Sequence, residues 1–157
     1  MQQSTDNPVI PVWDQLPEMT WNEKLAYWTY LTSRLKQAET PVWHTFQGGQ
    51  YLRMMQIPAH TVFVGRGHRH GHEIRLLQGS VVLIEEGKRT IHNAPDSIFS
   101  PPGYHTVCFT LTDVLGQTVH PDNGERDLRK LEEGIFEPVS DMLTLGETVH
   151  KRLTCQA

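Results

Sequence analysis

The sequence predicts a mostly β protein, with a helix before a set of short antiparallel strands and another helix after them. Between residues 50 and 120, short segments are β-branched or alternate in polarity, and Gly, Pro, Asn or Asp separate them. Strand signals at this spacing are typical of an antiparallel sandwich or barrel. Residues 21–37 instead repeat apolar side chains at helical spacing, and residues 123–136 look helical at least through Glu133.

The first elements follow from local signals. Residues 1–19 are rich in Pro, Asp, Asn and Gln and are expected to form an extended arm. Thr20 and Glu23 match the Thr-x-x-Glu capping box that begins a helix. The apolar stripe that follows predicts a packing surface, with a helix that docks in a partner's groove as the alternative. The stripe consists of Leu25, Trp28, Leu31 and Leu35.

Turns punctuate the region of strands. The segments "EEGK" at 85–88 and "NAPDS" at 93–97 each predict a hairpin turn, and "PPG" at 101–103 predicts a tight corner. The tail from Pro138 to Ala157 is weakly patterned, and its last residues are expected to fray. The expected organisation is a single domain with an arm and helix at 1–45, a barrel at 46–122, and a helix and tail at 123–157.

Composition narrows the classes of function. The chain has 157 residues, of which 38% are hydrophobic and 20% charged, as in an ordinary globular protein. The net charge of −4 offers no basic face for nucleic acid. No apolar run is long enough to cross a membrane, and the start lacks the features of a signal peptide. The expected location is therefore the cytoplasm, where the two cysteines would not form a disulfide framework.

The most informative stretch is "GRGHRHGHEIRLLQG", residues 65–79. His68, His70 and His72 alternate, so their side chains share one face if the stretch is extended. Neutral imidazoles are good ligands for transition metals, which need three or four converging donors. The stretch therefore predicts a metal site, with a solvated polar patch as the alternative. Further donors would come from elsewhere, the candidates being His60, His92, His105, His120 and Glu73, the last on the opposite face.

Two spacings resemble the motifs of the cupin superfamily. Counted back from Gly79, His72 falls on the Glu position of the first cupin motif and His68 on its second His position. Arg66 then stands where the family has its first His. In the second motif, "PDSIFSPPGYHT" keeps the Pro-x-Gly, but His105 falls one residue early and Thr106 takes the place of the His. The resemblance implies a cupin-like antiparallel β-barrel, or jelly roll, with an altered ligand set.

Residues 53–135 also resemble small cupin-like proteins encoded by tailed bacteriophages, a group with no established activity. The matching segments are "IPAHTVFVGRGHRHGHEIRLLQGSVVLI", "SPPGYHT" and "QTVHPDNGERDLRKLEE". This resemblance implies His68, His72 and His120 as the core ligands, with His70 as a candidate fourth. It also implies a bacterial or phage-infected host cell, and relatives of this kind suggest a homodimer.

The expected function is that of a cupin-like protein with one divalent transition metal (Zn, Fe, Mn or Ni) in the barrel. Such a protein could be a metalloenzyme that acts on a small molecule. The alternative is a non-enzymatic phage accessory or structural module, with a structural metal or none. Neither nucleic acid nor membrane is an expected partner. The expected pocket residues are Tyr104, His105, Glu73 and Arg75, although alternation places Arg75 opposite the histidines and Tyr104 could equally be a packing residue.

Overall fold

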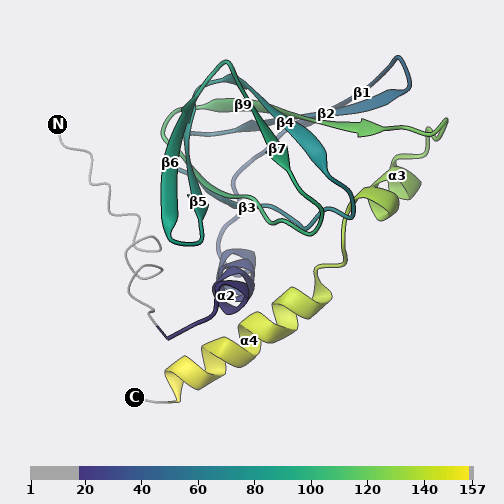
Figure 1. Cartoon of the computed structure of the whole chain (residues 1–157). Coiled ribbons are helices and arrows are strands. Elements are labelled where there is room, and N and C mark those ends of the chain that lie inside the picture. The colour runs from purple at the N-terminus through teal and green to yellow at the C-terminus, as the bar shows by residue number, and fades with distance from the viewer. Residues whose placement is uncertain (1–17, 156–157) are drawn as a thin grey trace. The chain divides into compact units, whose positions relative to one another are not determined.

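The computed structural model describes residues 18–155. Most of the arm expected at residues 1–19 thus lies outside the described residues. The described residues form two compact units, one of residues 36–139 and one that combines residues 18–35 with residues 140–155. Figure 1 shows the strands and helix α3 (Leu128–Ile135) of the first unit, and helices α2 (Trp21–Ser33) and α4 (Ser140–Thr154) of the second.

The larger unit consists of two antiparallel sheets, as Figure 1 shows. The five-stranded sheet has the order β1-β2-β9-β4-β7 and the four-stranded sheet the order β3-β8-β5-β6. The mostly β, jelly-roll-like class and the flanking helices are thereby confirmed, although hydrogen bonds between the described strands do not close the two sheets into one barrel. In chain order the strands are Val42–Gln47 (β1), Gln50–Ile57 (β2), Val62–Val64 (β3), His72–Gln78 (β4), Ser80–Glu85 (β5), Lys88–Asn93 (β6), Asp96–Ser100 (β7), Val107–Thr110 (β8) and Val114–Pro121 (β9).

The hairpin turn predicted at 85–88 and the corner predicted at 101–103 are confirmed, but the hairpin predicted at 93–97 is wrong. Strands β5 and β6 pair as a hairpin with Glu85 opposite Lys88, and Gly87 adopts a positive φ of 67° in the turn. Glycine reaches this left-handed region without the steric cost of a Cβ. The turn at 93–97 instead leads from β6 in the four-stranded sheet to β7 in the five-stranded sheet, so the two strands do not pair as a hairpin. The Pro-Pro-Gly corner lies between β7 and β8.

The register of the five-stranded sheet places a row of polar and aromatic side chains across four strands. Tyr51 on β2 pairs with His120 on β9, and His72 on β4 pairs with Ser100 on β7. Glu73 pairs with Val119, so the preceding residue His72 faces His120 across the β4–β9 ladder. Because alternate residues share a face, the row of Tyr51, His120, His72 and Ser100 lies on one face of the sheet.

Two apolar clusters form the core of this unit. The first joins both sheets through residues such as Ile57, Leu76 and Cys108. The second contains Tyr51 and three residues of the chain after the strands, Leu131, Ile135 and Phe136. Burial of this apolar surface is the main force that holds the elements together.

Helix α3, Leu128–Ile135, begins later than the expected position 123. Asn123 and Gly124 have φ values of 51° and 77°, which no α-helix accommodates. The helix starts instead where the Asp127 side chain accepts hydrogen bonds from the backbone N–H groups of Arg129 and Lys130. The prediction of a helix through Glu133 is confirmed.

The smaller unit is a pair of packed helices. The capping box of Thr20 and Glu23 is confirmed at the start of α2, Trp21–Ser33, which ends before the expected residue 37. The weakly patterned sequence after Pro138 did not predict helix α4, Ser140–Thr154, which most of this tail forms. A Cβ at Gly146 would collide with the backbone carbonyl of Ala26, so this glycine permits the helices to approach closely.

Polar contacts also join these two helices. The Tyr27 hydroxyl lies 3.3 Å from Nδ1 of His150, and the Arg152 guanidinium donates to the Glu23 carboxylate at 2.7 Å. Within residues 18–155, none of the helices is of a length and apolarity that would span a membrane.

Candidate functional site: a histidine cluster beside a cavity

His68, His72 and His120 form a compact cluster, called the histidine cluster below. The ring centroids of His68 and His72 are 3.9 Å apart, those of His72 and His120 5.0 Å, and those of His68 and His120 5.6 Å. The rings are nearly parallel, with interplanar angles between 6° and 29°. The three residues that the resemblance selected as core ligands are thus brought together.

Three different segments supply the cluster. His72 is the first residue of β4, and His120 is near the end of β9. His68 precedes β4 and forms an isolated bridge with Phe136, which follows α3. Backbone hydrogen bonds hold this loop on both sides. The carbonyl oxygen of His68 accepts from the N–H of Gly103 at 2.8 Å, and the N–H of Arg69 donates to the carbonyl oxygen of Ile135 at 2.8 Å.

The stretch from 68 to 72 is not one extended strand. Residues 69 and 70 form a bend, and the His70 side chain is exposed. Simple alternation over the three histidines therefore does not apply. Among the described residues, no ring contact joins His70 to the histidine cluster.

Burial controls the protonation of the cluster. Burial, followed by the neighbouring His72, lowers the pKa of His120 to about 3 and that of His68 to about 4. Burial also lowers the pKa of His72. The nearby guanidinium of Arg53 acts in the same direction on the pKa values of His68 and His120. At neutral pH the three imidazoles are therefore uncharged, the form in which histidine binds metals.

The ring nitrogens differ in their hydrogen bonds. Nε2 of His120 lies 3.0 Å from the hydroxyl of Thr118, two residues earlier on the same face of β9. His72 is only 4% exposed; its ring lies near the backbone of His70, which opposes the lowering of its pKa, but neither ring nitrogen makes a well-aligned hydrogen bond to a described residue. Buried polar atoms are rarely left without a partner, because desolvation is costly.

Tyr51 supports the cluster from β2. It is completely buried, and its ring centroid lies 6.1 Å from that of His120. Its hydroxyl lies 2.6 Å from Nδ1 of His44 on β1. Burial is the largest cause of the raised pKa of Tyr51, so the residue stays a neutral hydrogen-bonding phenol.

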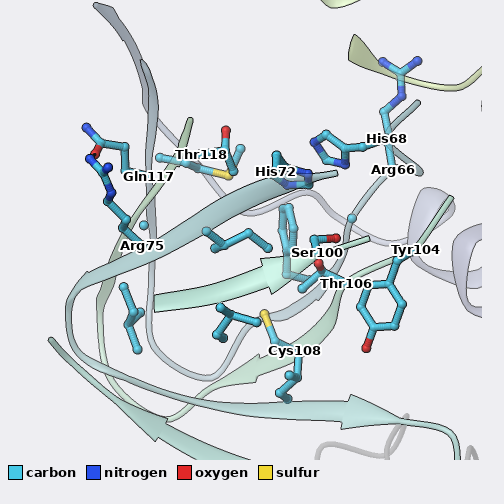
Figure 2. Close-up of a pocket in the computed structure, with 18 of the residues that line it drawn as sticks. Arg66, His68, His72, Arg75, Ser100, Tyr104, Thr106, Cys108, Gln117 and Thr118 are labelled. Atoms are coloured by element: carbon cyan, nitrogen blue, oxygen red, sulfur yellow. The ribbon is translucent and has the colours of Figure 1, made fainter. Parts of the chain in front are cut away.

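A cavity of about 440 Å³ lies between the sheets next to the cluster, and His68 and His72 line it. This volume suits a small molecule. Much of the wall is apolar, with side chains that include Met55, Ile57, Phe63, Ile74, Leu76 and Val81. Figure 2 shows His68, His72 and Ser100 on one side of this space, and Arg75 with Gln117 at the end away from Tyr104.

The four expected pocket residues have different positions. Tyr104 lines the cavity, and its hydroxyl donates a hydrogen bond to the Glu85 carboxylate at 2.9 Å. Burial and this carboxylate raise the pKa of Tyr104 well above its usual range. Arg75 also lines the cavity, but Glu73 holds its guanidinium at 3.1 Å. Glu73 and His105 do not line it.

Glu73 instead also accepts from the Ser97 hydroxyl at 2.8 Å, and its pKa is lowered mainly by the hydrogen bond from Arg75. Nδ1 of His105 lies 3.2 Å from the carbonyl oxygen of Gly65. The one-residue offset noted in the second motif is thus accompanied by a His105 ring that bonds the backbone.

Sequence reasoning missed several residues of the site, among them Tyr51, Arg53, Ser100 and Phe136. Arg53 lines the cavity from β2, and its guanidinium carbon lies 5.5 Å from the centroid of the Phe136 ring. The Phe136 ring is itself 4.8 Å from that of His68. Only the alternating pattern of "QYLRMMQI" could have indicated that Tyr51 and Arg53 share a face.

The histidine cluster has the donor types of a transition-metal site, but its nitrogens do not converge. Among the described residues, no group of three or more His, Cys, Asp or Glu side chains could hold an ion as the side chains stand. The nearly parallel packing of the three rings accounts for this, since rings that share an ion direct one nitrogen each to a common point.

No family model matches the chain, and a search of curated proteins found no relative. Solved structures that match in part include a cupin superfamily protein from Desulfitobacterium hafniense, with 9% identity, a TM-score of 0.47, and coverage of 59% of this chain and 87% of that one. A predicted oxalate decarboxylase from Thermotoga maritima matches with 17% identity, a TM-score of 0.45, and coverage of 53% and 80%. An acetylacetone dioxygenase from Acinetobacter johnsonii matches with 16% identity and a TM-score of 0.44. The match covers 56% of this chain and 68% of that one. The functional assignment therefore rests on the histidine cluster and the cavity of this chain.

Proposed function

We propose that this chain is a cupin-like protein in which His68, His72 and His120 hold one divalent transition-metal ion beside a cavity for a small molecule. The observation that carries the proposal is the state of His72. Its buried ring has two nitrogens, and neither makes a well-aligned hydrogen bond to a described residue. A bound ion would satisfy one of these nitrogens and offset the cost of burying the ring.

The separation of the rings of His72 and His120 supports the proposal. With metal–nitrogen bonds of about 2.1 Å and ligand angles of roughly 90–110°, the centres of two imidazoles on one ion lie about 4.5–5.3 Å apart. The observed 5.0 Å between His72 and His120 lies within this range, whereas the 3.9 Å between His68 and His72 is shorter and the 5.6 Å between His68 and His120 is longer. To share an ion, the rings of His68 and His72 would have to move apart by about 0.6 Å or more and turn so that one nitrogen of each is directed toward it.

The donor set favours certain metals. Three neutral imidazoles without a carboxylate suit Zn, Fe, Mn or Ni better than the oxygen-seeking Mg and Ca. Such an ion, when bound, supplies Lewis acidity or redox chemistry. The residues of the chain would then position a small molecule. The apolar wall excludes water, and Tyr104 presents a neutral hydroxyl that Glu85 orients.

A second candidate is a binding module without a metal. The parallel packing of the three rings and the absence of converging donors among the described residues favour it. In this case the cluster would be a neutral, hydrogen-bonding end of the cavity. The association with phages and the homodimer stay predictions from the resemblance.

Metal analysis of purified protein tests the proposal. We expect about one ion per chain after the chelator-stripped protein is incubated with Zn, Ni, Mn or Fe(II), together with a rise in Tm. The variant His72→Ala should lose both effects. The variant His70→Ala is the matched control, because His70 lies in the same tract but is exposed; it should keep both.

Two results would contradict the proposal. One is wild-type protein that neither retains nor is stabilised by any of the four metals. The other is a His72→Ala protein, folded by circular dichroism, that binds as much metal as the wild type. Either result would favour the metal-free binding module.

A further inference from the structure

The cavity is chemically uneven, and the unevenness bears on the kind of molecule that it would hold. Met55, Ile57, Phe63, Leu76 and Val81 provide an apolar wall. Such a wall recognises hydrocarbon, because its burial is favourable and needs no specific partner. Polar groups at the histidine end would therefore decide which head group the molecule carries.

Arg53 is the basic side chain of interest at that end. It lines the cavity, and its charge acts on both His68 and His120. Its Nε atom is buried and has no hydrogen-bond partner among the described residues, although the Arg53 side chain also interacts with that of Tyr51. None of the ion pairs between described residues involves Arg53. A partly buried guanidinium normally has a carboxylate or phosphate as its partner, with which it forms paired hydrogen bonds.

The other charges of the wall do not replace such a partner. Glu85 is engaged by the hydroxyl of Tyr104. Glu132 also lines the cavity but forms no ion pair with Arg53. The second arginine of this end, Arg66, lies over the same Phe136 ring at 4.8 Å and donates to the backbone carbonyl of Glu137.

We propose that the cavity binds a small carboxylate with an apolar body, and that Arg53 binds the carboxylate beside the histidine cluster. The inference rests on the proposed function, because an ion held by three neutral imidazoles would add positive charge to an end that already contains Arg53. An anionic head group neutralises this charge, whereas a neutral head group leaves it uncompensated in a space poor in water.

Calorimetric titration with octanoate and its neutral isostere octanamide tests the inference. The two probes share the hydrocarbon chain and differ in charge at the head group. We expect wild-type protein loaded with Zn to bind one octanoate per chain, about tenfold or more tighter than octanamide. The variant Arg53→Met should weaken octanoate binding about ten- to a hundredfold and change octanamide binding by less than about threefold.

Two further variants sharpen the test. Lys88→Met removes one positive charge at an exposed position of β6, outside the cavity wall, and should leave both affinities unchanged. Arg53→Lys keeps the positive charge but loses the planar guanidinium and its paired hydrogen-bond donors. It should therefore weaken octanoate binding by less than Arg53→Met does. It also serves if the methionine variant does not fold, as judged by circular dichroism.

The inference is overturned if octanoate and octanamide bind wild-type protein equally, if neither binds saturably, or if Arg53→Met weakens both equally. The metal content of each sample is measured before titration, so failure of the proposed function is seen separately as absence of bound Zn. In that event the same titrations of metal-free protein decide the role of Arg53 by itself.

Discussion

The rings of His72 and His120 face each other across the β4–β9 ladder with centroids 5.0 Å apart. The two residues are far apart in the sequence, and only the antiparallel register of these strands makes them neighbours. His68 joins them from the loop before β4. Together they form an uncharged group of imidazoles, of which His68 and His72 line one side of a cavity.

The first prediction concerns the pH dependence of stability in metal-free protein. The pKa values of His68 and His120, about 4 and about 3, lie below the value of 6.5 for an exposed histidine. Between pH 6.5 and about 4 the unfolded chain thus binds protons that the folded chain does not. The free energy of unfolding should fall as pH decreases, by about 1.4 kcal/mol per pH unit for each of the two histidines. Above pH 6.5 this contribution to stability is fully present.

Urea denaturation at several pH values between 7.5 and 5 measures this slope. The variant His120→Gln lacks one of the titrating groups, so its slope should be shallower than that of the wild type. The exposed His70 provides the control, and His70→Gln should keep the wild-type slope. Equal slopes for wild type and His120→Gln would show that His120 is not buried as a neutral group.

The second prediction concerns the close packing of α2 and α4. Alanine favours a helix over glycine by about 1 kcal/mol, yet Gly146→Ala should destabilise the protein, because its Cβ would meet the Ala26 carbonyl oxygen and Cβ of Tyr30. Overpacking of this kind costs about 1–3 kcal/mol. The measurement is thermal unfolding followed by circular dichroism at 222 nm, the usual helix signal, with a lower Tm expected for the variant.

Gly134 is the matched control for this substitution. It also lies in a helix, α3, but a Cβ there would meet no atom within 4 Å. Gly134→Ala should therefore raise stability by about 0.5–1 kcal/mol. If Gly146→Ala stabilised the protein as much as Gly134→Ala, this result would contradict the close contact between α2 and α4 at Gly146.

The third prediction concerns the two cysteines, which are both free thiols. Burial raises the pKa of Cys108 to about 12, so almost no thiolate is present at neutral pH. Since the thiolate is the reactive form, iodoacetamide at pH 7.5 should modify the exposed Cys155 in the folded protein and leave Cys108 unmodified. Mass spectrometry of tryptic peptides identifies the modified residue.

Unfolded protein is the control for this labelling. In urea both cysteines should react at similar rates. Rapid labelling of Cys108 in folded protein would indicate that reagents enter the cavity and that the thiol is more acidic than its burial implies.

The sequence was sufficient to predict those elements that depend on residues close to one another in the chain. Thr20 and Glu23 identify the start of α2, because a capping box acts within one turn of helix. The turns at 85–88 and 101–103 follow from the backbone preferences of Gly and Pro. The alternation of short segments predicted the antiparallel sheets. The tract of histidines, together with the resemblance, identified the three residues that the fold assembles.

Tertiary structure decided the remainder. Helix α4 was missed because Gly146 and its β-branched neighbours lower helix propensity, and packing against α2 compensates for that loss. The unequal positions of His68 and His70 result from a bend whose backbone bonds go to Gly103 and Ile135, distant in sequence. Tyr51, Arg53 and Ser100 join the site only through strand register. The sequence by itself thus determined the class of fold and the chemistry available, whereas long-range pairing and burial determined which of these side chains meet and that their imidazoles stay neutral.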